Sequence, residues 1–110
     1  MADADEAKAL GKATLAEFGH IDILVNNAGV TLPQTILETE IDKFHTVINV
    51  NLLAPLLLTQ IFVPSMIEKK RGKIINISSR GAIRAFPTGS VYSASKAGLQ
   101  LLTQSMAVEF

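Results

Sequence analysis

The 110-residue sequence contains no cysteine, no tryptophan, two histidines and one tyrosine. Without cysteine, the chain has no disulfide, no thiolate metal ligand and no cysteine nucleophile. The two histidines, His20 and His45, are isolated and lack the spacing of a metal site, so we expect no metal centre. Catalysis by this chain would have to use hydroxyl, amide, amine or carboxylate side chains.

An excess of either charge is also absent, because ten Lys and Arg residues balance ten Asp and Glu residues. There is no basic block, so we expect no nucleic acid or anionic membrane surface as a partner. Residues 1–6 are acidic and lack the features of a signal peptide. The most apolar stretch, Ile48 to Ile67, is interrupted by polar residues and prolines, which favours a buried helix over a membrane span. We therefore expect a cytoplasmic protein without a membrane partner.

Hydrophobic residues make up 48% of the sequence, which is enough for the core of one domain over residues 1–110. Gly19 is placed to end a first helix, and Thr39 to cap a second one ahead of an acidic first turn. Two strands joined by a long helix are expected to be parallel, with a right-handed crossover. The predicted order is helix 5–18, strand 21–25, helix 39–70, strand 73–77, and a helix from 90 or 91 onward.

The single tyrosine stands four residues before a lysine, in the run Tyr92-Ser93-Ala94-Ser95-Lys96 of the predicted last helix. Residues at i and i+4 lie on one helical face, with Cβ atoms about 5–6 Å apart. A fixed positive charge beside a phenol favours the phenolate, so Tyr92 can exchange a proton with a substrate oxygen near neutral pH. The same spacing also occurs in ordinary surface contacts, so the pair alone does not establish catalysis.

Polar residues follow both predicted strands at the point where each strand ends. Asn26-Asn27-Ala28-Gly29 follows the first strand, and Ser78-Ser79 follows the second. In open α/β sheets, ligands bind outside the carboxyl ends of the strands. The last helix begins on the same side, so we expect Ser79 and Tyr92 to face one crevice.

Four motifs in this order, Asn27-Ala28-Gly29, Asn51, Ser79 and Tyr92-x-x-x-Lys96, resemble the short-chain dehydrogenase/reductase family of the classical type. The likeness covers essentially the whole chain. It implies an α/β fold with a Rossmann-type doubly wound parallel sheet. It also implies an NAD(P)-dependent oxidoreductase that interconverts a small-molecule carbonyl and an alcohol by hydride transfer, with NAD or NADP as cofactor and no metal.

The resemblance assigns a role to each motif residue. Tyr92 is the general acid/base, and Lys96 favours its phenolate and hydrogen-bonds the nicotinamide ribose, so that both residues also contact the cofactor. Ser79 holds the substrate oxygen, with Ser78 as the alternative one position earlier. Asn27, Ala28 and Gly29 line the cofactor cleft, where small side chains let the backbone approach; a simple strand-end turn is the alternative.

Asn51 completes the catalytic set of the family by anchoring a water that connects Lys96 to solvent. Asn49 is the competing asparagine, which we interpret as a helix-surface or sheet-contact residue. Pro55 lies four residues after Asn51 and has no N–H to donate to its carbonyl. We expect a local distortion of the helix that frees this carbonyl for the water, and a mere bend in a core helix is the alternative.

The glycine-rich dinucleotide turn of the family, Thr-Gly-x-x-x-Gly-x-Gly, is missing, since none of the seven glycines makes that spacing. Also missing are the N-terminal βαβ unit, the residue that chooses NAD over NADP, and the C-terminal strands. We therefore expect residues 1–110 to form one partial NAD(P)-binding Rossmann-like domain, a β-α-β-α catalytic middle segment. Such a segment is expected to expose both outer sheet edges and to be poorly active or inactive alone.

Two other functions remain open at this point. The chain is either the catalytic segment or an inactive truncated fragment that acts only as an oligomerisation or interaction module. In the family, the helices carrying Asn51 and Lys96 commonly pack against a second subunit, so a homo-oligomer through these helices is implied. An epimerase or dehydratase of the same fold would keep the Tyr92–Lys96 pair, but the set with Asn51 and Ser79 looks more like the reductases.

Overall fold

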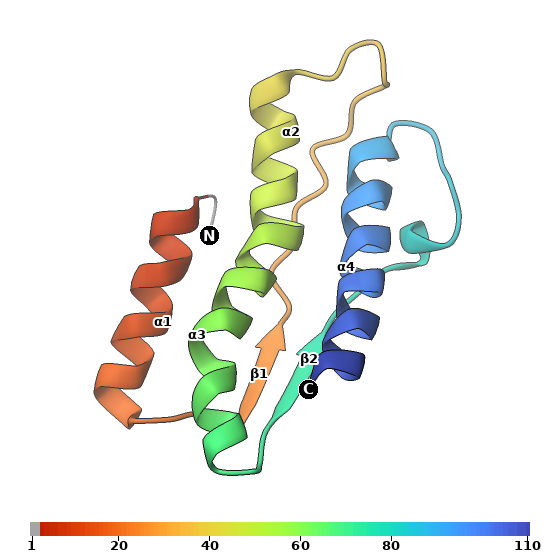
Figure 1. The fold of residues 1–110 in the computed structure, drawn as a ribbon. Coiled ribbons are helices and arrows are strands. Elements are labelled where there is room, and N and C mark those ends of the chain that lie inside the picture. Colours follow the sequence, from red (N-terminus) through yellow and green to blue (C-terminus); the bar gives the residue numbers. More distant parts are fainter. Residues whose placement is uncertain (1–2) are drawn as a thin grey trace.

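Helices and strands alternate along the chain, as the sequence predicts. The structure is a computed structural model, and it describes residues 3–110. Figure 1 shows the order of the elements. They are α1 (Ala4–Phe18), β1 (Ile23–Asn26), α2 (Ile41–Ile48), a π-helical turn (Asn49–Leu53), α3 (Ala54–Glu68), β2 (Lys73–Asn76), a 3-10 turn (Arg80–Ala82) and α4 (Ser90–Glu109).

The two strands pair in parallel, which confirms the predicted pairing. Ile23 lies opposite Lys73 at one end of the ladder, and Asn26 lies opposite Asn76 at the other. Both strands therefore deliver their following loops to the same edge of the sheet (Figure 1). Within the described chain each strand pairs only with the other, so both outer edges of this sheet are open, as expected.

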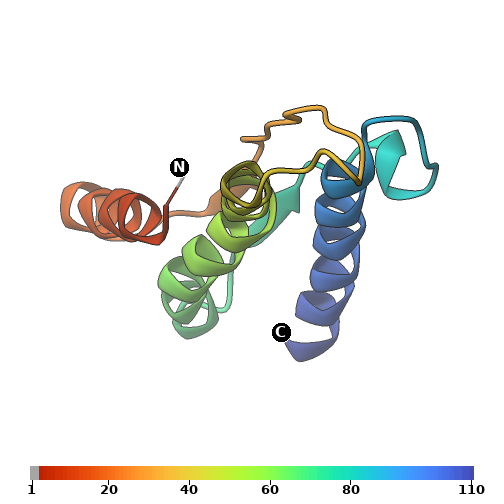
Figure 2. The same ribbon diagram turned by 90° about the horizontal axis from the view of Figure 1, so that it is seen from above.

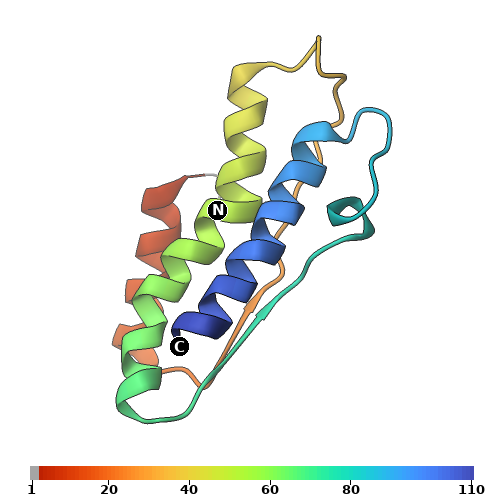
Figure 3. The same ribbon diagram turned by 45° about the vertical axis from the view of Figure 1, so that its right-hand side comes forward.

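The helices lie side by side on one face of the sheet. Figures 2 and 3 show α1, the α2–α3 helix and α4 in one layer, with the α2–α3 helix in the middle. The core forms where α3 meets the sheet. Its buried members are Leu24, Leu58, Phe62, Val63 and Met66.

Close packing holds α1 against α3 in this layer. A Cβ added at Gly11 of α1 would lie 2.7 Å from Cδ1 of Ile61 of α3, so the two helices approach where a side chain has no room. Gly19 ends α1 with φ +78°, and its N–H donates to the carbonyl of Leu15 at 2.7 Å. Gly19 is therefore the C-terminal stop that the sequence predicts.

The opposite face of the sheet is open within residues 3–110. Alternate strand residues point to it, because successive side chains of a strand face opposite sides. Ile23, Val25, Ile75 and Ile77 are 41–53% exposed, whereas Leu24 is buried among the helices. Within residues 3–110 the helices therefore cover one face of the sheet only.

The start of α2 corrects one prediction. Thr39 does not cap this helix; Glu40 occupies the N-cap position, and its side chain makes no capping hydrogen bond. The hydroxyl of Thr39 instead donates to the carbonyl of Thr35 at 2.7 Å. A local hydrogen bond of this kind is an alternative to helix capping for a threonine hydroxyl, and Thr39 makes the local bond instead of the cap. The helix accordingly begins two residues later than predicted and ends at Glu68.

A π-helical turn interrupts the long helix just before Pro55. Residues Asn49–Leu53 form this turn, and the N–H of Ala54 donates to the carbonyl of Asn49, five residues back. Proline cannot supply the next regular helical donor, so a local irregularity at this point follows from the sequence. The predicted distortion is confirmed, and Figure 2 shows that α2 and α3 differ in direction. That the carbonyl of Asn51 holds a water stays a prediction.

The helical segment Ile41–Glu68, formed by α2, the π-helical turn and α3, is the one described segment that is long and apolar enough to cross a membrane, with a mean hydropathy of 1.8 in its apolar window. Half of its apolar window is buried inside the protein. Its polar residues Asn51 and Thr59 are buried as well, and both make hydrogen bonds within the chain. These contacts fit the central helix of a folded core, which passes the same test of length and composition.

Candidate active site

Asn51 lies in the π-helical turn, and its side chain is completely buried. Its Oδ1 accepts the N–H of Val30 at 2.9 Å, and its Nδ2 donates to the carbonyl of Val30 at 2.9 Å. Nδ2 also donates to Oγ of Ser95 at 3.0 Å. Because the Val30 N–H can only donate, it fixes which end of the Asn51 amide carries the oxygen. Asn51 therefore joins the loop after β1 to α4.

Lys96 is 3% exposed, and its Nζ donates to the carbonyl of Ile77 just after β2, at 2.9 Å. Gly29 lies beside this ammonium group. A Cβ added at Gly29 would be 3.4 Å from Nζ of Lys96 and 3.5 Å from Oδ1 of Asn51. Gly29, Asn51 and Lys96, separated along the chain, thus meet at the carboxyl ends of both strands.

Tyr92 lies on the first turns of α4 and is partly exposed. Its ring stands edge-on to Phe86 with the ring centroids 6.4 Å apart. Gly81 packs against the other part of this turn, since a Cβ there would lie 3.4 Å from Cε1 of Tyr92 and 3.2 Å from Oγ of Ser93. Phe86 and Gly81, from the loop after β2, therefore border the Tyr92 ring.

Ser79 caps the 3-10 turn that holds Gly81. Its Oγ accepts the N–H of Gly81 at 3.1 Å, and its backbone is extended. Gly81 therefore contacts both residues: its N–H binds the Ser79 hydroxyl, and its Cα side faces the ring of Tyr92. Ser78 directly precedes this cap, and its side chain makes no hydrogen bond within residues 3–110.

Asn27 and Ala28 lie in the loop after β1, directly before Gly29. Together with Pro55 they line a groove of about 410 Å³ between α1, β1 and the α2–α3 helix, whose remaining lining is mainly apolar. The run Asn27-Ala28-Gly29 therefore leads from this groove to Lys96. Asn27 and Ala28 are both exposed.

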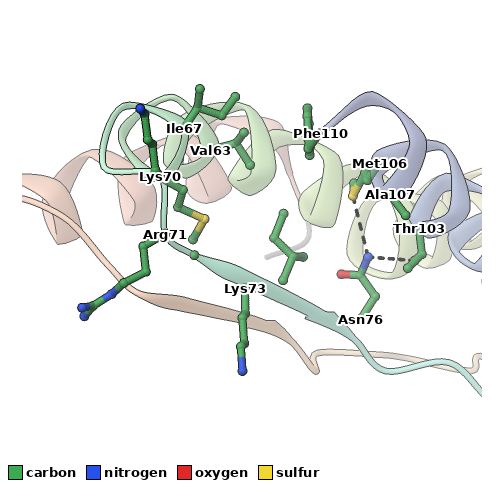
Figure 4. Close-up of a pocket in the computed structure, with 13 residues that line it drawn as sticks. Val63, Ile67, Lys70, Arg71, Lys73, Asn76, Thr103, Met106, Ala107 and Phe110 are labelled. Atoms are coloured by element: carbon green, nitrogen blue, oxygen red, sulfur yellow. Dashed lines mark hydrogen bonds between the residues drawn. The ribbon is translucent and has the colours of Figure 1, made fainter.

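A wider hollow of about 550 Å³ lies far from these residues, between the end of α3, β2 and the end of α4 (Figure 4). It contains none of the predicted site residues. Figure 4 shows Asn76 at one end of it and Lys70 and Arg71 at the other, with Lys73 between them on the strand. It follows the open edge of β2, so we interpret it as a packing surface and not as the reaction site.

Between residues 3 and 110 no three His, Asp or Glu side chains come together in a way that could hold a metal ion.

The structure adds partners that the sequence analysis missed. Ser95 is completely buried and joins Asn51 to the Tyr92 turn, while Val30 and Ile77 contribute backbone groups only. Backbone donors and acceptors leave no mark on residue type, so no sequence signal identifies Val30 or Ile77. Ser95 carries a weak signal, because a serine inside a helix commonly turns its hydroxyl back to a carbonyl of the preceding turn.

The sequence model of the short chain dehydrogenase family matches residues 1–110. The 2-dehydro-3-deoxy-D-gluconate 5-dehydrogenase of Formosa agariphila is 39% identical over 110 residues, which are all of this chain and 42% of that protein. A 3-oxoacyl-[acyl-carrier-protein] reductase of Synechocystis is 39% identical over 99% of this chain and 44% of its own length. The chain spans less than half the length of these relatives.

Solved structures show the same arrangement of elements. A metagenomic short-chain oxidoreductase in complex with NADP has a TM-score of 0.92 and 41% identity, over 98% of this chain and 49% of its own. A gluconate 5-dehydrogenase from Burkholderia cenocepacia, in complex with NADP and tartrate, has a TM-score of 0.90 and 35% identity, over 99% of this chain and 43% of its own. The fold is thus part of a Rossmann-type parallel α/β sheet, and the chain belongs to the short-chain dehydrogenase family.

Proposed function

We propose that this chain carries the catalytic segment of an NAD(P)-dependent oxidoreductase that interconverts a carbonyl and an alcohol. The observation that carries the proposal is the meeting of Gly29, Asn51 and Lys96 at the carboxyl ends of both strands, one helical turn from Tyr92. That edge is where open α/β sheets bind ligands. Family membership supports oxidoreductase chemistry, because the relatives compared above are dehydrogenases and reductases.

In this proposal Tyr92 moves the proton. Its phenol donates a proton to the carbonyl oxygen during reduction and takes a proton from the alcohol during oxidation. The hydroxyl of Ser79 holds the substrate oxygen, with Ser78 as the alternative. Bound NAD or NADP supplies or accepts the hydride.

The residues present fit the nicotinamide-ribose end of such a cofactor. The Lys96 ammonium has three donors, and one goes to the carbonyl of Ile77. The others suit ribose hydroxyls, and Gly29 leaves room beside Nζ for a ligand to approach. Tyr92 lies one helical turn before Lys96 on α4, and Asn27 and Ala28 continue the β1 loop into the groove beside it.

The same residues do not provide the phosphate-binding end. No glycine-rich turn leading into a helix is present among the seven glycines of this sequence, and such a turn is what holds a pyrophosphate. We therefore propose that residues 1–110 alone bind the cofactor weakly and turn over slowly or not at all.

An interaction module is the second candidate function, and the open sheet face favours it. Ile23, Val25, Ile75 and Ile77 present apolar side chains there, and both sheet edges are unpaired within the described chain. Exposed apolar residues on the helices, Phe44 among them, also fit association with a second copy through the helices that carry Asn51 and Lys96. We keep a cytoplasmic location, and no nucleic-acid or membrane partner, as part of the proposal.

Replacement of Tyr92 by phenylalanine tests the proposed function. Tyr92→Phe keeps the ring that packs on Phe86 and removes only the proton-transferring hydroxyl. Because positioned acid–base groups contribute about 10²–10⁴-fold, we expect carbonyl reduction to fall by at least about 10²-fold. The measurement is NADH or NADPH oxidation by the full chain with a panel of ketones and aldehydes, beside a cofactor titration.

Cofactor affinity is expected to stay nearly unchanged in Tyr92→Phe. Turnover that persists in this variant would overturn the role of Tyr92. Stable self-association of the unmodified chain, with neither nicotinamide binding nor turnover, would favour the interaction module instead.

A further inference from the structure

The hydroxyl of Ser95 lies completely buried on α4 between Tyr92 and Lys96. It donates to the carbonyl of Tyr92 at 2.7 Å and accepts from Nδ2 of Asn51 at 3.0 Å. We propose that Ser95 is a positioning residue for the reaction, because it ties Asn51, and with it the loop after β1, to the turn of α4 that carries Tyr92. The inference rests on the proposed function for its catalytic consequence, but its structural part can be tested without it.

Donor and acceptor are fixed for each hydrogen bond that joins Val30, Asn51, Ser95 and Tyr92. The carbonyl of Tyr92 can only accept, so the Ser95 hydroxyl must donate to it. The remaining lone pairs of Ser95 then accept from Asn51, whose amide is already oriented by the Val30 N–H. A continuous set of bonds therefore runs from the backbone of the β1 loop through Asn51 and Ser95 to the backbone of α4.

These hydrogen bonds lie next to the space beside Gly29, so their loss is expected to affect the reaction site. Oδ1 of Asn51 and Nζ of Lys96 both face the space beside Gly29, where a Cβ would meet them at 3.5 Å and 3.4 Å. Without the Ser95 hydroxyl, one N–H of Asn51 is left unpaired in a buried place, and the amide is held by Val30 alone and no longer by α4. The groups that face the reaction site would then lose their fixed arrangement.

A second hydroxyl on the same helix provides a matched control. Oγ1 of Thr103 donates to the carbonyl of Leu99 at 2.7 Å and accepts from Nδ2 of Asn76 at 2.8 Å. This is the same pair of bonds, two turns further along α4 and away from the site residues. Thr103→Val removes those bonds while keeping the side-chain shape, so it reports the cost of losing such a pair in general.

Hydrogen exchange of the Val30 amide in the full chain tests the structural part. In Ser95→Ala we expect this amide to exchange about tenfold faster than in the unmodified chain, since the group that it donates to has lost a partner. The side-chain amide resonances of Asn51 should shift in the same variant. In Thr103→Val both readings should stay within about twofold, even where overall stability falls. Unchanged Val30 exchange in Ser95→Ala, or equal acceleration in both variants, would overturn the inference.

Turnover tests the catalytic part under the conditions used for Tyr92→Phe. Ser95→Ala should lower kcat about tenfold and leave KM nearly unchanged, because ground-state binding does not depend on the alignment of the proton-transferring group. Thr103→Val should keep kcat within about twofold. An unaltered kcat in Ser95→Ala overturns the positioning role. If the unmodified chain shows neither nicotinamide binding nor turnover, the proposed function fails in favour of the interaction module, and Val30 exchange still decides the structural part.

Discussion

Two hydroxyl groups of α4 each bind an asparagine side chain from another element through the same kind of hydrogen bonds, but the two pairs hold different parts of the fold in place. Asn51 donates to Ser95, and Asn76 donates to Thr103, and in both cases the hydroxyl donates onward to a carbonyl of the preceding turn. The Asn51 pair is fully buried and holds a loop and a π-helical turn. The Asn76 pair is partly exposed and borders the open hollow of Figure 4.

The partners on the far side of each asparagine explain the difference. Asn76 accepts from Nδ2 of Asn26 at 2.7 Å, its neighbour across the parallel ladder, so this pair ties the sheet to α4. Asn51 instead pairs with both backbone groups of Val30, in a loop that has no regular partner. The strand β2 is already held by the backbone ladder, so the Asn76 bonds only fix it to α4. The loop after β1 has no such ladder, so the Asn51 bonds to Val30 determine its position beside Lys96.

Asn51→Leu is the change expected to separate the two pairs most strongly. Leucine has a similar size but leaves the N–H and the carbonyl of Val30 without this partner inside the protein. Each unpaired buried group costs about 1–3 kcal/mol, so we expect the loss of both to lower the free energy of unfolding by about 2–6 kcal/mol. Urea titration followed by circular dichroism measures it.

Asn27→Ala is the control for this change, since Asn27 is exposed in the same loop. Substitutions at exposed positions usually change stability by less than about 0.5 kcal/mol. A loss in Asn51→Leu no larger than that of Asn27→Ala would show that the Val30 contact contributes nothing to the position of the loop.

Asn76→Leu is expected to have a smaller effect. It leaves the Asn26 amide without its acceptor, but the new side chain gains apolar contact with Met106 at the edge of the hollow. We expect a loss of about 1–2 kcal/mol in unfolding free energy. Replacing Asn26 as well as Asn76 by leucine should recover part of that loss, because removing both partners of this hydrogen bond leaves neither amide unpaired.

A double variant, Asn26→Leu with Asn76→Leu, that is less stable than the sum of the single changes would contradict a purely attaching role. Turnover and Val30 exchange provide the second reading. Both should follow only the folded fraction in Asn76→Leu, and a selective loss of either would place this pair in the site as well.

The sequence could predict the elements of this fold better than the contacts of its site. Periodicity and Gly19 predict the helices and strands to within two residues, and Pro55 predicts the irregularity of the long helix. Thr39 was wrong as a cap because its hydroxyl bonds to Thr35, a choice that propensity does not decide. The Ser95–Asn51 bond joins residues 44 positions apart, and only the packed fold brings them together.

Gly29→Ala is expected to have the smallest effect on stability and is the finest test of the space beside Lys96. The added Cβ would lie 3.4 Å from Nζ and 3.5 Å from Oδ1 of Asn51, which is ordinary contact and requires little movement. We expect a change below about 1 kcal/mol in unfolding free energy. Gly72→Ala is the matched control, since a Cβ there would lie 2.5 Å from Cγ of Met66 and would cost about 1–3 kcal/mol through overpacking.

Cofactor binding should reverse this order. The methyl group of Gly29→Ala fills space that the proposal assigns to the nicotinamide ribose, whereas Gly72 lies at the other end of the molecule by the hollow. Titration with NADPH and NADH should therefore show weaker binding for Gly29→Ala, by about tenfold if one hydrogen bond to Lys96 is lost. Gly72→Ala should bind as the unmodified chain does once its folded fraction is taken into account. Equal affinities in all three proteins would mean that the space beside Lys96 does not receive the cofactor.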